Sequence, residues 1–126
     1  AAVKEEQLSP SADDAWAPIT RRGSFAEVPV SWVRRNPENV HLIDVRRPDE
    51  VHGVLPHISG AELIPLDRLQ SEMEGWDRGS RIVTICRSGK RSGNAAAQLS
   101  QMGFHHVASM SGGMMAYHQK SGGNCG

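Results

Sequence analysis

The sequence predicts an α/β domain with a central parallel sheet of about five strands and helices on both faces. Three observations support this class. Short apolar, β-branched runs typical of buried strands alternate along the chain with segments of helical spacing. Strands that are joined through helices form right-handed crossovers, which give a parallel sheet covered on both sides. The length of 126 residues suits one domain of this kind.

The first 24 residues lack this alternation. Pro, Ser and Asp are scattered through residues 1–24, and no apolar period holds there. We therefore expect residues 1–24 to be an N-terminal arm or a linker, and residues 25–126 to form the domain. Trp16 and Ile19 are the arm residues that could pack back on the domain.

The first half of the domain holds two predicted strands and two predicted helices. Residues 27–30, EVPV, are a short strand candidate. A short helix over 30–36 follows, with Ser31 as its N-cap and an Asn-Pro pair at its end. The apolar run VHLIDV, 40–45, predicts a buried strand that ends at Arg-Arg-Pro. The segment 48–55 has room for one or two helical turns.

The second half repeats the alternation. The run at 61–66 predicts a strand, and apolar residues at helical spacing over 66–76 predict a helix. The run RIVTI, 81–85, is uncharged after its first residue, which is typical of a central strand. An Ala-rich helix over 91–102 ends at a glycine, and HVASM, 106–110, is the last strand. A Gly-Gly turn and a short helix follow it.

Composition and motifs argue against several classes of function. Fourteen basic and fourteen acidic residues give a formal net charge of zero, so we expect neither a nucleic-acid nor a membrane partner. No apolar run approaches the roughly 20 residues of a membrane span. The two cysteines form no C-x-x-C pair and the six histidines show no metal-binding spacing, so no metal and no other cofactor is expected. An unpaired reactive thiol fits a reducing compartment, and we expect the protein to be cytoplasmic.

One cysteine lies where a parallel sheet places its ligands. Cys86 directly follows the strand at 81–85 and precedes the helix at 91–102, and such sheets bind ligands beyond the carboxyl ends of their strands. Ser88 and Gly89 are small enough for the backbone to curl tightly, which directs successive N–H groups inward. We therefore expect the amides that follow Cys86 to converge on its sulfur.

The same loop is rich in positive charge. Arg87, Lys90 and Arg91 follow the cysteine, and the start of the next helix adds the positive end of its dipole. These influences favour the thiolate over the thiol. The expected site is a partly exposed nucleophile, Cys86, at the base of an anion-binding cradle.

The spacing distinguishes between anions. Cysteine enzymes that cleave phosphate esters use C-x5-R, in which the loop wraps a phosphoryl group. Here Arg91 is the fifth residue after Cys86, which gives C-x4-R and a smaller cradle. A cradle of this size suits a cysteine that carries one additional sulfur atom, with N–H groups aimed at the outer sulfur of a persulfide.

Four segments together resemble one family. Taken in order, they are similar to single-domain members of the rhodanese (sulfurtransferase) family. The segments are LIDVR at 42–46, HISGAELIPL at 57–66, CRSGKRS in the cysteine loop and GFHHVASMSGGMMAY at 103–117. The resemblance covers roughly residues 25–120. The sequence departs from the family pattern after the Gly-Gly turn, where Tyr117 stands near the usual Trp and the Gly-x-Pro exit is missing.

The resemblance implies a reaction. Cys86 would attack the outer sulfur of a donor such as thiosulfate, expel sulfite and become a persulfide, and an acceptor, either cyanide or a thiol, would then take that sulfur. The residues implied to bind substrate are Arg87, Ser88, Gly89, Lys90 and Arg91. Asp44 and Arg46 match the family's D-x-R element and are expected to support the loop. The implied partners are a small sulfur donor, a thiol acceptor and possible fused or separate enzymes of sulfur metabolism.

Two other functions stay open at this point. A rhodanese fold without catalysis would be a regulatory or binding module, and a cysteine-dependent phosphatase or arsenate reductase is disfavoured by the C-x4-R spacing. Cys125 stands in a Gly-rich tail. It is either an exposed thiol without a role or a group that returns to Cys86 and resolves the persulfide.

Overall fold

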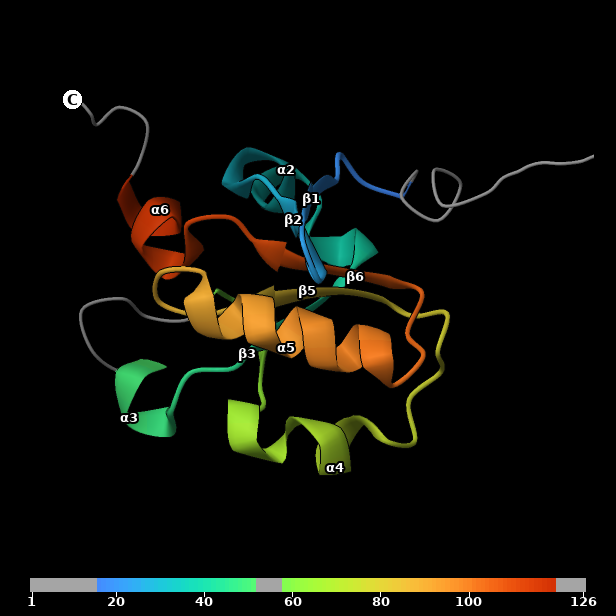
Figure 1. Cartoon of the computed structure of the whole chain (residues 1–126). Helices are drawn as coiled ribbons and strands as arrows, with labels where there is room; N and C mark the ends of the chain where they lie inside the picture. Colours follow the sequence, from blue (N-terminus) through green and yellow to red (C-terminus); the bar gives the residue numbers. More distant parts are fainter. Residues whose placement is uncertain (1–15, 52–57, 120–126) are drawn as a thin grey trace, which may run out of the picture.

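The computed structural model describes residues 16–51 and 58–119, in which a six-stranded sheet forms the centre (Figure 1). The strands are β1 (Thr20–Arg22), β2 (Phe25–Val28), β3 (His41–Asp44), β4 (Glu62–Leu63), β5 (Arg81–Ile85) and β6 (His106–Met110). Their order is β1-β2-β6-β5-β3-β4, and every neighbouring pair is parallel except β1 with β2. The predicted parallel sheet is confirmed, with one additional strand.

That additional strand lies in the range predicted to be an arm. β1 pairs antiparallel with β2, and Thr20 stands opposite Glu27. All three residues of β1 are exposed and none is apolar, so the strand carries no hydrophobic pattern by which it could be recognised. Trp16 and Ile19 pack against the core, as suggested for them. The prediction of an arm therefore fails for residues 16–24; residues 1–15 lie outside the described part of the chain.

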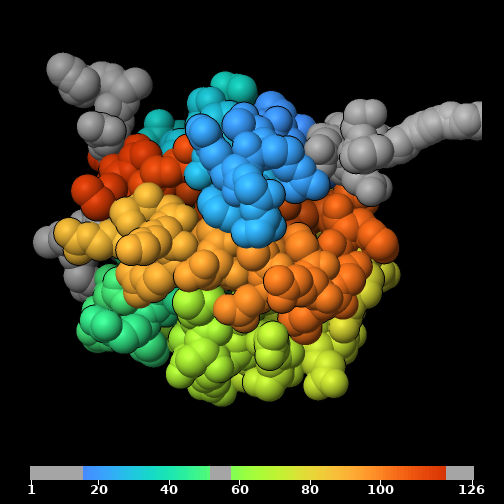
Figure 2. All heavy atoms as spheres, viewed as in Figure 1, coloured from blue at the N-terminus to red at the C-terminus, as the bar shows by residue number. Residues whose placement is uncertain are grey.

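Helices cover both faces of the sheet, as predicted. They are α2 (Val30–Arg35), α3 (Pro48–Val51), α4 (Leu69–Met73), α5 (Lys90–Gln101) and α6 (Gly113–Gln119), with short 3-10 turns η1 (Pro37–Asn39) and η2 (Leu66–Arg68). Side chains of β5 alternate between the two faces. Ile82 packs with α4 and α5, whereas Val83 packs in the cluster that includes residues of α2 and α6. Figure 2 shows α5 crossing one face between the β1–β2 hairpin and α4.

Two boundaries differ from the predictions around one proline. The strand expected over 27–30 ends at Val28, and α2 begins at Val30 with Pro29 in the N-cap position instead of Ser31. Pro29 has no backbone N–H to continue the sheet ladder, which ends the strand there. Of the helical turns predicted over 48–55, α3 supplies residues 48–51, and residues 52–57 lie outside the described part.

The topology brings the functional elements to one edge. β2, β3, β5 and β6 run parallel, so their carboxyl ends lie at the same edge of the sheet. The loop after β5 and the turn after β6 start from this edge. Figure 1 shows α3, the start of α5 and α6 at the same end of the molecule.

The core on the α5 face predicts a difference between two leucines. Leu99 of α5 is fully buried, whereas Leu63 of β4 is 38% exposed. We expect Leu99→Ala to lower the free energy of unfolding by about 2–5 kcal/mol, because it removes buried methyl groups and leaves a cavity. Leu63→Ala is the matched control and should change it by less than about 1 kcal/mol. Urea unfolding of both variants measures this, and equal losses would contradict the assignment of the core.

Candidate active site

Cys86 follows the last residue of β5 and is almost completely buried. Its exposed fraction is 1%, and it belongs to the apolar cluster on the α5 face. The prediction of a partly exposed nucleophile is therefore wrong. The cause is strand alternation: Cys86 is in phase with Ile82 and Thr84, and so its side chain points under the start of α5 and not into solvent.

The sulfur nevertheless has polar partners. The backbone N–H of Gly89 donates a hydrogen bond to Sγ at 3.0 Å, so one of the amides predicted to converge on the sulfur reaches it. The hydroxyl of Ser92, in the first turn of α5, lies 3.4 Å from Sγ. Gly89 has a φ of +105°, a conformation that glycine adopts without strain.

Ser92 connects the cysteine to a buried polar network. The hydroxyl of Ser92 lies 2.6 Å from that of Ser109 on β6, and Thr84 Oγ1 donates to the carbonyl of Ser92 at 2.8 Å. All three side chains are fully buried, so these hydrogen bonds satisfy groups that have no access to water. Sequence reasoning missed the three residues. Ser92 stands next to the predicted loop, but nothing in the sequence connects it to Ser109.

The first turn of α6, which begins at the Gly-Gly turn, holds the cysteine loop through two backbone hydrogen bonds. Met114 N–H donates to the carbonyl of Cys86 at 2.7 Å, and Met115 N–H donates to the carbonyl of Arg87 at 2.9 Å. In a planar trans peptide, the C=O and the following N–H point in opposite directions. The bonds to α6 therefore direct the N–H groups of Arg87 and Ser88 away from α6.

Only glycine fits at position 113. A Cβ on Gly113 would lie 2.5 Å from the carbonyl oxygen of Cys86 and 2.6 Å from that of Arg87, and the φ of Gly113 is +63°. The close approach of this turn to the cysteine loop is thus what allows the two hydrogen bonds from α6 to form.

The three cations of the loop have different surroundings. The side chains of Arg87 and Lys90 are exposed, and no ion pair to either is found among residues 16–51 and 58–119. Arg91 instead forms a two-pronged ion pair with Glu50 of α3. Its two terminal nitrogens each lie 2.7 Å from a different carboxylate oxygen.

Glu50 was not among the predicted site residues. It precedes Arg91 by 41 positions, and no motif connects the two. The hydrogen bond from Arg91 and, after it, one from the backbone of Arg47 lower the pKa of Glu50 from 4.5 to about 2 despite partial burial. The same pairing raises the pKa of Arg91. Both side chains therefore carry full charge at neutral pH.

The predicted loop-supporting residues form a buried pair with each other. Arg46 Nη2 lies 2.7 Å from Asp44 Oδ2, and Arg46 Nε lies 2.9 Å from Asp44 Oδ1. Both side chains are 1% exposed. The residue between them, Val45, donates its N–H to the carbonyl of Ile85, one position before the cysteine. This bond connects the segment to the base of the loop, and its role in supporting the loop stays a prediction.

The described residues contain no group of three or more His, Cys, Asp or Glu that could hold a metal ion. None of the helices in this part is long and apolar enough to cross a membrane. A cleft opens beside Arg91. Its lining residues are Val45, Arg47, Pro65, Leu66, Asp67, Gln70, Arg91 and Gln98.

Comparison with known families identifies the fold. The family model for the rhodanese-like domain matches residues 30–120. The chain belongs to the rhodanese-like family. A rhodanese-related protein from Thermoplasma volcanium superposes with a TM-score of 0.65 at 25% identity, over 72% of this chain and 88% of that one. The predicted family and fold class are thereby confirmed.

Two relatives in sequence add to this. A putative sulfurtransferase of Bacillus subtilis, YtwF, is 41% identical over 81 residues, which are 64% of this rhodanese-like chain and 75% of that protein. An uncharacterized Synechocystis protein, slr1261, is 38% identical over 85 residues, or 68% of this chain. The match spans only 46% of the Synechocystis protein's length.

The contact at Gly113 predicts a specific loss. Gly113→Ala should slow alkylation of Cys86 by iodoacetamide or shift its pH profile, because the added Cβ displaces the loop carbonyls. It should also cost about 1–3 kcal/mol of stability. Gly23→Ala is the matched control, since Gly23 has a φ of +65° but no atom within 4 Å of the added Cβ. Identical alkylation behaviour in both variants would contradict the proposed role of the turn.

The ion pair between Glu50 and Arg91 predicts a loss of folding stability at acid pH. The pKa of Glu50 is about 2 in the folded protein against 4.5 in a free side chain, so in this interval the unfolded chain binds more protons and stability rises with pH. The stability difference between wild type and Glu50→Gln should be constant above about pH 4.5, decrease below it and vanish near pH 2. Urea unfolding across this range measures it; a difference already lost at pH 5 would contradict the assignment.

Proposed function

We propose that this chain is a sulfurtransferase that moves a sulfane sulfur from thiosulfate or a persulfide to a thiol or cyanide through a Cys86 persulfide. The observation that carries the proposal is the loop geometry. The amide of Gly89 donates to the cysteine sulfur, and the bonds from α6 turn the next N–H groups away from the helix. The name of the B. subtilis relative supports the same activity.

The reaction has two balanced steps. The Cys86 thiolate attacks the outer sulfur of thiosulfate, a new S–S bond forms, and the bond to the sulfonyl sulfur breaks with its electron pair leaving on sulfite. Cyanide or a thiolate then attacks the outer sulfur of the persulfide. The S–S bond to Cys86 breaks, the product is thiocyanate or a new persulfide, and the thiolate of Cys86 is regenerated.

The loop supplies stabilisation where charge accumulates. A deprotonated persulfide carries its negative charge on the outer sulfur, and fixed backbone N–H donors stabilise such a charge without reorganising. Arg87 and Lys90 are exposed beside the loop, where they raise the local concentration of an anionic donor. Ser88 and Gly89 let the loop approach the donor closely, and Asp44 and Arg46 hold its base.

The sulfur acceptor is proposed to be a low-molecular thiol or a partner enzyme of sulfur metabolism, either fused or separate. In the Synechocystis relative the matched region makes up less than half of the protein. A protein with a matching region of this kind can therefore carry further sequence beside it, which leaves room for a fused partner.

The activity predicts an adduct on one cysteine. Incubation with thiosulfate should raise the intact mass of the protein by one sulfur atom, and Cys86→Ala should abolish both this adduct and the formation of thiocyanate from thiosulfate and cyanide. Cys125→Ser is the matched control and should retain both. Full activity in Cys86→Ala would refute the mechanism. A wild-type protein that forms no persulfide with any donor would be a binding module instead.

A further inference from the structure

Arg91 is the cation that closes the cysteine loop, yet both of its terminal nitrogens are already paired with a carboxylate. Both terminal nitrogens lie 2.7 Å from the two oxygens of Glu50. The Arg91 and Glu50 side chains are 33% and 18% exposed, respectively, so the pair lies at the surface of the site and is only partly hydrated. A two-pronged pair of this type fixes the guanidinium and neutralises its charge.

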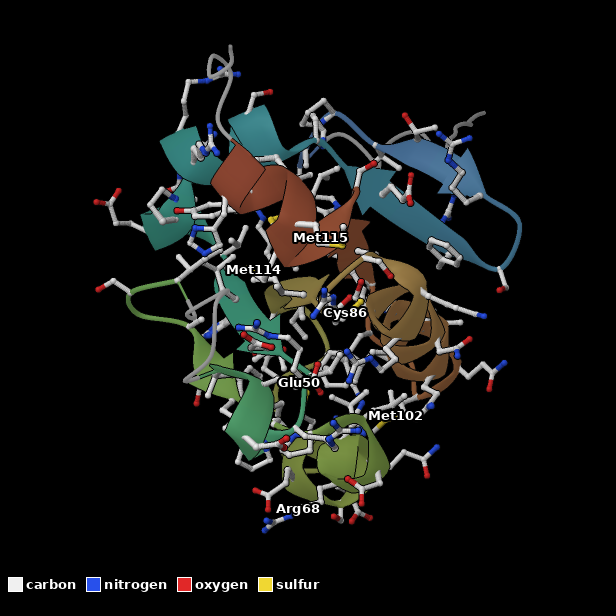
Figure 3. All side chains as sticks on the ribbon, turned by 90° about the vertical axis from the view of Figure 1, so that its left-hand side faces the viewer. Glu50, Arg68, Cys86, Met102, Met114 and Met115 are labelled. Carbon is white, nitrogen blue, oxygen red and sulfur yellow. The ribbon has the colours of Figure 1, made fainter. Side chains whose placement is uncertain are left out.

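The ion pair with Arg91 places the carboxylate of Glu50 beside the cysteine loop. Arg91 directly precedes Ser92, whose hydroxyl lies 3.4 Å from Cys86 Sγ, and follows two residues after Gly89, whose N–H donates to that sulfur at 3.0 Å. Figure 3 looks onto the end of the molecule at which Figure 1 shows α3 and the start of α5, and Glu50 lies below Cys86 in this view. A donor anion that approaches Cys86 therefore meets a fixed negative charge beside a neutralised arginine.

Several other charges near Arg91 are paired within the described part of the chain. Arg47 Nε lies 3.3 Å from Asp49 Oδ1 and 3.7 Å from Glu50 Oε2. Asp44 and Arg46 form a buried pair of their own. Arg87 and Lys90 are exposed on long side chains. They attract an anion from solution, but water and salt screen such cations, so each contributes little to holding a donor once it is bound. Without Glu50, both terminal nitrogens of Arg91, next to Ser92 at the cysteine loop, would be released to pair with a doubly charged donor.

We propose that Glu50 determines which sulfur donors the site uses: by occupying Arg91, it disfavours doubly charged thiosulfate relative to singly charged sulfane-sulfur donors such as organic persulfides and thiosulfonates. This inference rests on the proposed sulfurtransferase function and narrows its substrate class. The ion pair, in which Glu50 positions Arg91, is the structural basis of this proposal. The negative charge of Glu50 is the property that distinguishes doubly charged from singly charged donors.

Two donors of nearly the same shape isolate the effect of charge. Thiosulfate carries two negative charges, and methanethiosulfonate, in which a methyl group replaces one oxygen, carries one. In both cases the Cys86 thiolate attacks the terminal sulfur and forms the same persulfide. The bond to the sulfonyl sulfur breaks, and its electron pair leaves on sulfite or on methanesulfinate.

The experiment compares kcat/KM for the two donors, with cyanide as acceptor, in wild type and in Glu50→Gln. Glutamine keeps a hydrogen-bond acceptor for Arg91 but removes the charge. The ratio of kcat/KM for thiosulfate to that for methanethiosulfonate should rise on the order of tenfold at low salt, and less at high salt. The control Glu72→Gln removes a carboxylate of α4 that pairs with Arg68 of η2 and should leave the ratio unchanged.

The double variant Glu50→Gln with Arg91→Gln separates charge from loop disorder. It removes the released guanidinium, so the ratio should return to the wild-type value even where both rates are lower. A ratio that does not rise in Glu50→Gln, including equal losses with both donors, would overturn the inference. Should Glu50→Gln not fold, Glu50→Asp must retain the wild-type ratio, and a tenfold rise there would equally overturn it.

The same measurements keep this inference apart from the proposed function. If wild type forms no persulfide with either donor, the sulfurtransferase function itself fails, and the inference fails with it. If wild type uses both donors and the ratio does not respond to Glu50→Gln, the function stands and only the role of Glu50 is refuted.

Discussion

The two hydrogen bonds from the first turn of α6 to the carbonyls of Cys86 and Arg87 are the interaction on which the site depends. They come from an element that follows β6, whereas the loop follows β5, and the parallel pairing of these strands is what brings the two together. Because the carbonyls are held on one side, the amides are directed to the other. Gly113 is required where the two backbones approach each other.

The burial of Cys86 changes how the nucleophile is understood. Its sulfur is shielded from bulk solvent and contacts the Gly89 amide and the Ser92 hydroxyl. Such fixed polar groups stabilise charge more effectively than mobile water does, because they are already oriented before reaction. The three cations of the loop differ in their surroundings, which the composition of the loop does not show. Arg87 and Lys90 face solvent, whereas Arg91 is bound to Glu50.

The parts of the fold that the sequence could predict are those with a local signal. The run at 81–85 has the apolar, β-branched character of a central strand, and the small residues after Cys86 identify the loop. β1 could not be found, since its three residues are exposed and polar. The pairing of Glu50 with Arg91 and that of Ser92 with Ser109 are long-range contacts, for which a single sequence offers no periodic pattern. The burial of Cys86 follows from strand alternation, which the concentration of charge after it obscured.

A crystal structure of the protein after reaction with a sulfur donor tests the central claim most directly. We expect the outer sulfur of the Cys86 persulfide to lie on the side of the loop away from Gly113. At least two backbone nitrogens of residues 87–91 should then lie within about 4 Å of it, the usual limit for hydrogen bonds to sulfur. An outer sulfur that points toward the Gly112-Gly113 turn, or that contacts none of these amides, would contradict the account.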